Sequence, residues 1–303
     1  MLVSAGLLAS CDAGSGGPAD AAEAGANASP SVGPVTTGAG AGTGVGASPR
    51  KDLHWTSAMV RQGSPTEQPL LCVGIVLESY PPQCGGDVRL VGWDWGEVDG
   101  ETVEGAVTWV DTVFVVGTFV DGTFTLARPP STSRPPETGP EPTPTADHFP
   151  ELCADPLRGA AQSAGAGVRA DTRALSDLGR RLEATDGYVA SWVSDGHAFL
   201  NVVVTGDPER VRTVARTLWS GRLCVQQRAV ATHADMLAAQ KALEPLAQQS
   251  HQCLSSSPGP DGRLLVGVTL ADPETVAAVH RLVSPWLGPD DVVITSRLRP
   301  LVG

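Results

Sequence analysis

The chain has 303 residues and a formal net charge of −12, and 41% of its residues are hydrophobic, which allows two ordinary domains with their own cores. Its 33 acidic residues outnumber the 21 basic ones and no basic patch occurs, which argues against nucleic acid and against anionic membrane surfaces as partners. No apolar run reaches the ~18 residues that a membrane-spanning helix needs.

A short apolar run near the N-terminus leads into Leu8-Ala9-Ser10-Cys11. These residues resemble the lipobox of bacterial lipoproteins, in which a peptidase cuts before the cysteine and a diacylglyceryl group is attached to its sulfur. The resemblance implies a signal-peptide remnant at 1–11, lipidation at Cys11 and an anchor on the extracytoplasmic face of the cell membrane. The alternative is a secreted protein without lipid. Because no Lys or Arg precedes Cys11 and the apolar core is short, we expect either that the translation start lies further upstream or that this sequence has been trimmed.

The next segment, 12–50, predicts a disordered tether. Of its 39 residues, 31 are Ala, Gly, Pro, Ser or Thr, so it offers too little apolar surface to offset the entropy of ordering.

Residues 51–128 predict a small all-β domain. Strands are expected at 70–77, 88–93, 103–109, 111–120 and 123–126, and Asp121-Gly122 indicates a tight hairpin turn between the last two. Five short strands favour a small OB-like or SH3-like barrel, with a small sandwich as the alternative. Residues 129–150 contain eight prolines and predict an extended, semi-rigid linker that either separates the domains or lies along one of them.

Residues 151–303 predict a duplicated α+β domain, with repeats at about 171–230 and 234–300. At an offset of 65 residues, Asp207-Pro208 and Asp272-Pro273 both follow an apolar strand and predict a helix start. Each repeat has the expected order α-β-β-α-β, with helices on one face of an antiparallel sheet. This arrangement is close to ferredoxin-like folds.

Five cysteines remain once Cys11 is assigned to lipid, and an exported chain permits disulfides. Cys72 and Cys84 bracket a Pro-Pro bend and predict one bond. We expect a second bond between Cys153 and Cys224, which leaves Cys253 as a thiol; the competing pair is Cys224 with Cys253. Cysteine and histidine spacings typical of metal sites do not occur, so we expect no metal and no cofactor.

The stretch 92–101 has an unusual composition, with two tryptophans and four carboxylates. Trp93 and Trp95 would share one face of a strand and could form a ligand platform. The simpler interpretation is a barrel wall followed by an acidic turn, because the carboxylate spacing does not match a calcium loop.

Three motifs resemble those of uncharacterised actinobacterial envelope proteins: C-x-G-x-x-x-E-S-Y-P-P-Q-C-G-G at 72–86, G-W-D-W at 92–95 and the hairpin at 117–124. The resemblance implies an envelope location and the Cys72–Cys84 pair, and it implies no activity. We therefore predict a non-catalytic envelope lipoprotein that binds another envelope protein or polymer, or serves as a structural module. The alternatives are an envelope enzyme whose active site is not visible in the sequence, and a solute-binding lipoprotein.

Overall fold

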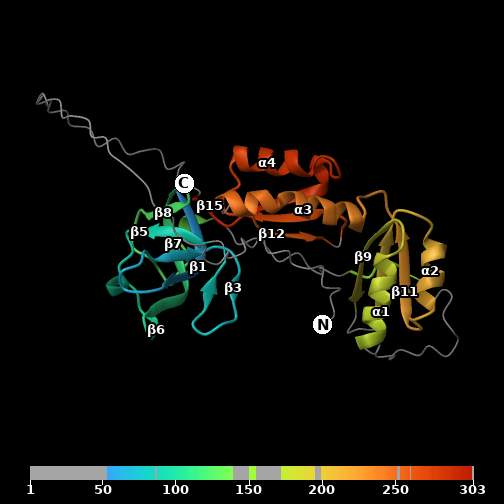
Figure 1. Cartoon of the computed structure of the whole chain (residues 1–303), viewed down its shortest axis with the longest axis horizontal. Helices are drawn as coiled ribbons and strands as arrows, with labels where there is room; N and C mark the ends of the chain where they lie inside the picture. Colours follow the sequence, from blue (N-terminus) through green and yellow to red (C-terminus); the bar gives the residue numbers. More distant parts are fainter. Residues whose placement is uncertain are drawn as a thin grey trace, which may run out of the picture.

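The structure is a computed structural model that describes residues 53–85, 87–138, 150–154, 172–194, 199–250, 253–259 and 261–301, with the side chains of Asp87, Thr172, Ala174, Cys253 and residues 248–250 left aside. These residues form an α+β structure with a barrel and two smaller units, coloured blue-green, yellow and orange-red in Figure 1. The predicted signal remnant with Cys11, the 12–50 tether and half of the predicted linker, 139–149, lie outside the described residues.

Five strands close the barrel. They pair in the order β1-β2-β5-β8-β7, and β7 pairs back with β1. Neighbouring strands are antiparallel except for β5 and β8, which are parallel. The five strands are β1 (His54–Gln62), β2 (Leu70–Cys72), β5 (Asp87–Val91), β7 (Val107–Val120) and β8 (Thr123–Leu126). The barrel prediction is therefore confirmed at the level of a closed, mixed five-stranded barrel, and the sandwich alternative is wrong.

Short strands extend this barrel at its margins. β3 (Val76–Leu77) and β4 (Gln83–Cys84) form a hairpin between β2 and β5. β6 (Thr102–Glu104) pairs with the start of β7, and β15 (Arg299–Pro300) pairs with the start of β1. The C-terminus of the chain thus returns to the first described strand.

Several predicted strand boundaries need correction. The sequence did not predict β1, because Trp55 on its outer face and Val60 on its inner face are both buried and the alternation of a half-buried strand is lost. The predicted strand 103–109 is interrupted at Gly105, whose positive φ of 61° turns the chain between β6 and β7. The Asp121-Gly122 hairpin is confirmed, since both residues have positive φ.

The interior of the barrel is packed with aliphatic side chains around Phe124, which is fully buried. At Gly117 an added Cβ would lie 2.0 Å from the carbonyl oxygen of Thr125. A glycine is therefore required where β7 and β8 approach most closely.

The first α/β unit follows the barrel in sequence. Its three-stranded sheet has the order β11-β10-β9, with β9 antiparallel and β11 parallel to the central strand. Leu178, Leu182 and Val211 of the two helices pack on one face of this sheet. The elements are α1 (Thr172–Glu183), β9 (Tyr188–Ser194), β10 (Phe199–Val204), α2 (Pro208–Arg216) and β11 (Arg222–Gln227).

The second α/β unit repeats this order of elements. Its sheet has the order β12-β13-β14, again with one antiparallel and one parallel pair. The elements are α3 (His233–Ser250), β12 (Cys253–Pro258), β13 (Leu264–Val268), α4 (Pro273–Val283) and β14 (Val292–Ser296). The expectation of antiparallel sheets is wrong for both units, and the ferredoxin-like architecture is not confirmed. In each unit the strand after the second helix lies directly beside the central strand and is parallel to it. Each unit therefore contains an ordinary β-α-β connection, in place of the split β-α-β connection of a ferredoxin-like fold.

The predicted offset of 65 residues holds for the helix starts and not for the strands. Asp207 and Asp272 both accept a hydrogen bond from a backbone N–H in the first turn of their helix. The strand residues that face the helices are related by an offset of 64 residues, because the turn between β13 and α4 is one residue longer than the turn between β10 and α2. These residues are Leu200, Val202 and Val204 in the first unit and Leu264, Val266 and Val268 in the second. An offset of 65 would place Gly267 opposite Val202 and exchange the two faces of the sheet.

The second unit lies between the barrel and the first unit, although it comes last in the sequence (Figure 1). Leu254 and Leu298 of the second unit are buried in the core cluster of the barrel. At its other end, His233 at the start of α3 contacts the ring of Tyr188 edge-on, with ring centroids 5.5 Å apart. The barrel and the second unit are therefore joined by shared core residues, which the predicted separation into a β domain and a duplicated domain did not anticipate.

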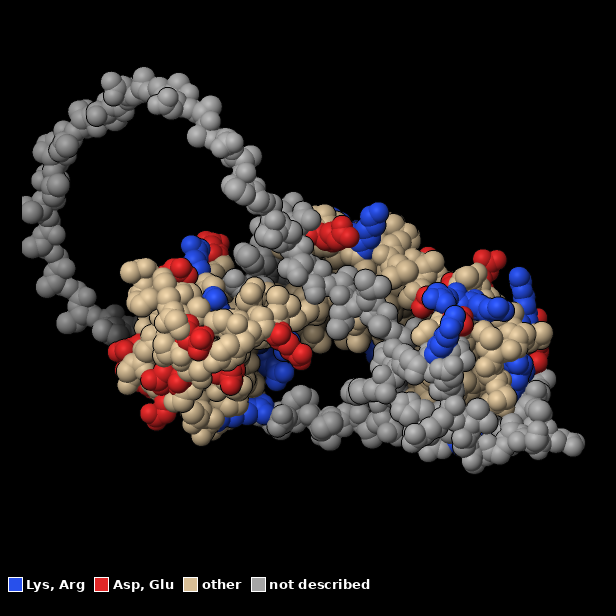
Figure 2. Space-filling model, turned by 60° about the horizontal axis from the view of Figure 1, so that its bottom comes forward, with Lys and Arg blue, Asp and Glu red and all other residues tan. Residues whose placement is uncertain are grey.

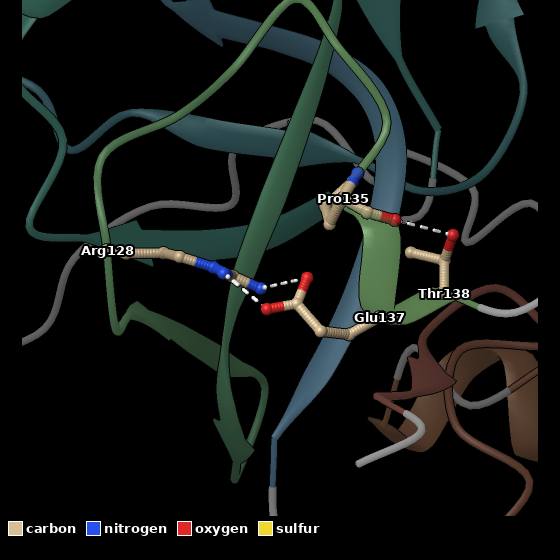
Figure 3. Close-up of polar contacts among 4 residues, drawn as sticks. All are labelled: Arg128, Pro135, Glu137 and Thr138. Carbon is tan, nitrogen blue, oxygen red and sulfur yellow. Dashed lines mark hydrogen bonds and ion pairs between the residues drawn. The ribbon is translucent and has the colours of Figure 1, made fainter.

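The first part of the predicted linker lies along the barrel. Phe114 and Ser131 exchange two backbone hydrogen bonds of 2.8 and 3.0 Å. Arg128 forms an ion pair of 3.1 Å with Glu137, and the hydroxyl of Thr138 donates to the carbonyl of Pro135 (Figure 3). Residues 129–138 of the predicted linker thus lie along the barrel, against the wall formed by β1 and β7, which is one of the two arrangements expected for this segment.

Candidate binding site

Both predicted disulfides are confirmed. The Cα atoms are 5.2 Å apart for Cys72–Cys84 and 5.6 Å apart for Cys153–Cys224, within the range that a disulfide allows. Structural disulfides are typical of proteins that work in an oxidising compartment outside the cytoplasm. The backbone of Cys253 begins β12, but its side chain lies outside the described part, so its predicted free thiol stays a prediction.

The Cys153–Cys224 bond attaches an extended strap, defined as residues 150–154, to the sheet of the first unit. Asn201, which is fully buried, accepts a hydrogen bond of 3.0 Å from the backbone N–H of Leu152. The indole N–H of Trp192 donates to the carbonyl of Pro150 at 2.9 Å. The strap therefore covers the face of the sheet that the helices leave open.

Trp93 and Trp95 do not share a strand face. β5 ends at Val91, Gly92 has a positive φ of 82°, and Asp94 caps a short 3-10 helix at Trp95–Glu97. The two rings meet edge-to-face with centroids 5.3 Å apart and pack against the barrel core. The geometry favours the barrel-wall interpretation, and the ligand platform stays a prediction.

The described residues contain no helix long and apolar enough to cross a membrane and no group of three or more metal-ligating side chains. Tyr188 and Arg216 show a clear pKa shift. Burial raises the pKa of Tyr188 to about 12, and burial together with nearby Arg212 lowers that of Arg216. Both groups belong to the first unit, where Tyr188 shares a hydrogen bond with Ser191 and Arg216 donates to the carbonyl of Gly221.

A cavity of about 360 Å³ lies at the barrel, beside the end of the second unit. Its walls are formed by β1, by the neighbouring part of β7 and by the chain that runs from β2 into the β3–β4 hairpin. Arg297, which follows β14, completes the lining. We call this the junction cavity; its lining residues are Thr56, Ser57, Ala58, Met59, Cys72, Val73, Gly74, Val76, Asp111, Thr112 and Arg297.

The junction cavity combines one negative and one positive side chain with hydroxyl and apolar groups. Asp111 comes from β7 and Arg297 from the second unit. Within the described ranges, neither side chain forms a hydrogen bond or an ion pair. Two opposite charges that are not neutralised by the protein can each take a partner from a ligand.

Two connections hold the walls of the cavity in place. The Cys72–Cys84 disulfide closes the base of the β3–β4 hairpin, and Arg61 of β1 donates a hydrogen bond of 2.8 Å to the carbonyl of Pro82. At the tip of the hairpin, Tyr80 packs edge-on against Trp109 at 5.8 Å while it remains 72% exposed. The site is thus largely preformed, as ligand sites usually are.

A cation–π cluster next to the cavity fixes the other end of β1. The guanidinium groups of Arg134 and Arg299 lie 5.0 and 5.2 Å from the ring of Trp55, which is buried. Arg134 comes from the segment after the barrel and Arg299 from β15. The cluster therefore holds the C-terminal strand against β1, where pairs of this kind contribute about 0.5–2 kcal/mol each.

Charge is distributed unevenly over the molecule. Carboxylates are spread over the barrel on the left of Figure 2, and arginine side chains, interspersed with carboxylates, are prominent over the first unit on the right. Residues 53–138 contain eleven acidic residues and four arginines, so a ligand of the barrel meets a negative field on approach.

Sequence reasoning did not find the junction cavity, because its residues come from four segments that are far apart in the chain. Comparison of the chain with protein-family models, with curated proteins and with solved structures gave no significant match. The function must therefore be inferred from the residues themselves, and the resemblance to envelope lipoproteins stays a prediction.

Proposed function

We propose that this protein is a lipid-anchored, non-catalytic binding protein of the cell envelope whose ligand occupies the junction cavity. The observation that carries the proposal is the cavity itself, because its lining includes Asp111 and Arg297, which form no ion pair among the described residues, and a disulfide holds one of its walls. The lipobox at Cys11 and the 12–50 tether would hold this site away from the membrane surface.

The barrel topology supports a binding role. Strands β1, β2 and β5 form an antiparallel meander, and β7 returns to lie beside β1, which is the Greek-key order of an OB-like barrel. OB-like barrels bind extended polymers on their outer faces. We infer an OB-like barrel with a ligand other than nucleic acid, since the acidic surface of this barrel would repel phosphates.

The binding role is tested by capture of partners from native envelope membranes with the full chain. Ser57→Trp fills the cavity from β1, and Thr102→Trp places the same side chain on exposed β6 as a matched control. We expect a captured component that is lost with Ser57→Trp and kept with Thr102→Trp. Equal capture by both variants would show that the cavity is not the binding site.

The anchor is tested separately. Cys11→Ala should move the protein from the membrane fraction to the soluble envelope fraction or the medium. Retention of this variant on membranes after a high-salt wash would rule out the lipid anchor.

A further inference from the structure

We infer that the junction cavity binds a short, extended peptide, which adds as a strand to a free edge of β1 and carries one cationic and one anionic group. The inference rests on the proposed function and names the ligand class. On one side, β7 pairs with β1 along nearly its whole length. On the other side, β15 pairs with residues 54 and 55 and β2 pairs with residues 59–61. Among the described strands, none pairs with Thr56, Ser57 or Ala58 on this second side.

The backbone of Ser57 points toward this free edge. Ser57 lies opposite Phe114 of β7, and the N–H and C=O of Phe114 are both bonded to Ser131, on the side away from β1. Ser57 and Phe114 are therefore a non-hydrogen-bonded pair of the antiparallel ladder. A second contact agrees, because Leu53, four residues earlier, accepts a hydrogen bond from Leu301 on the β15 side. The N–H and C=O of Ser57 thus face the gap between β15 and β2.

This gap opens into the junction cavity, whose lining includes residues 56–59. A gap of three residues corresponds to about 10 Å of extended chain. A peptide that exchanged both backbone hydrogen bonds with Ser57 would continue the sheet between β2 and β15. Strand addition at a free edge is a general mode of peptide recognition, in which backbone bonds give affinity and side-chain contacts give specificity.

The lining determines which peptide fits. Arg297 favours a carboxylate and Asp111 favours an ammonium or guanidinium group. Met59 and Val76 add an apolar surface to the lining, which can take an aliphatic side chain. The lining therefore favours a peptide that carries an aliphatic residue together with one acidic and one basic group.

The test uses tripeptides with Lys or Arg at one end, Asp or Glu at the other, and Ala, Val, Leu or Phe in the middle, in both directions. Binding to the full chain is measured by saturation-transfer NMR and calorimetry. We expect dissociation constants below 1 mM for part of this set. For the best peptide, N-methylation of the amide that pairs with Ser57 should weaken binding at least tenfold, because it keeps the side chains and removes the donor.

Two protein variants probe the same bonds. Ser57→Pro removes the N–H that faces the gap without removing a bond to β7, so it should keep the fold and weaken peptide binding at least tenfold. Arg297→Gln should weaken binding about tenfold for peptides with a carboxylate and have little effect once that carboxylate is amidated. Thermal melting and unreduced mass spectrometry confirm that both variants are folded.

Absence of binding across the tripeptide set would overturn the inference, and so would equal binding of the N-methylated peptide. The proposed function would survive either result if the wild type captures a membrane component and Ser57→Trp does not. The ligand would then be something other than a peptide, such as a glycan. If Ser57→Trp, which fills the cavity, still captured the component and still bound peptide, both proposals would be wrong.

Discussion

The two α/β units have the same order of elements and differ in what covers the second face of their sheets. In the first unit the 150–154 strap covers this face, and Asn201 at its centre is fully buried and hydrogen-bonded. The position related to Asn201 by 64 residues is Leu265, which is 38% exposed. A buried amide and an exposed leucine at equivalent positions show that the burial of a residue depends on the neighbours of its unit and not on its strand alone.

The second unit is instead held at the ends of its strands. Leu254 and Leu298 enter the barrel core, and β15 continues from the unit into the barrel sheet. Beyond the core of each unit, the first unit is held to its strap by a disulfide and two hydrogen bonds, whereas the second unit is held to the barrel by shared hydrophobic packing. The two attachments can be removed separately.

The largest effect is expected from removing the Cys153–Cys224 bond by Cys153→Ser with Cys224→Ser. The bond joins residues 71 positions apart, and the loop-entropy model gives such a bond about 4 kcal/mol. Hydrogen-exchange mass spectrometry should show loss of amide protection in the first unit, with the barrel and the second unit little changed. The matched control, Cys72→Ser with Cys84→Ser, should destabilise the barrel instead, by about 3 kcal/mol. Equal loss of protection in all three parts would contradict independent attachment.

The next effect concerns the attachment of the second unit to the barrel. Leu298 is fully buried in the barrel core, so Leu298→Ala should lower the free energy of unfolding by about 3 kcal/mol. Limited proteolysis should become faster between the barrel and the second unit. Leu265→Ala, on the exposed face of the same unit, should change stability by less than about 0.5 kcal/mol. A similar cost for both variants would show that Leu298 does not join the two parts.

Local signals in the sequence predicted the parts of the fold that depend on neighbouring residues. Asp207-Pro208 and Asp272-Pro273 predicted two helix starts, and Asp121-Gly122 predicted a hairpin. The repeated order of elements followed from these starts. Both disulfides were predicted from cysteine positions and the need to hold a segment poor in large side chains.

Features that depend on distant neighbours could not be predicted. Trp55 on the outer face of β1 is buried by Phe114 and by Arg134 and Arg299, all of which come from far along the chain. The one-residue difference between the turns that follow β10 and β13 is invisible in a short alignment, yet it decides which face each strand residue takes. The junction cavity depends on distant neighbours too, since β15 must pair with β1 to leave its short free edge.

Alkaline pH should lower the stability of the first unit more than that of the second, because of Tyr188. The equivalent position at the start of the first strand of the second unit is Cys253. Burial raises the pKa of Tyr188 to about 12, against about 10 in the unfolded chain. The stability that this shift represents is fully present below pH 10 and is lost as the pH rises toward 12, amounting to about 2–3 kcal/mol.

Comparison of wild type with Tyr188→Phe isolates this contribution. The variant should be less stable at neutral pH by about 1 kcal/mol, because the hydrogen bond to Ser191 is lost. Between pH 10 and pH 12 the first unit of the wild type should lose more stability than that of the variant. Parallel denaturation curves for the two proteins across this range would show that Tyr188 ionises without a stability cost.

The smallest effect compares the helix caps that the two units share. Asp207 accepts one hydrogen bond, of 2.9 Å from the backbone N–H of Glu209. Asp272 accepts two, of 2.8 and 3.1 Å from the backbone N–H and the hydroxyl of Thr275, which is buried. Asp207→Ala should therefore cost about 1 kcal/mol and Asp272→Ala somewhat more, up to about 2 kcal/mol, because the second change also leaves a buried hydroxyl without its partner. Asn at either position keeps an acceptor for the N–H and should restore most of the stability measured by urea denaturation. If Asp207→Ala proved the more damaging change, the number of bonds made by each cap would not determine its contribution.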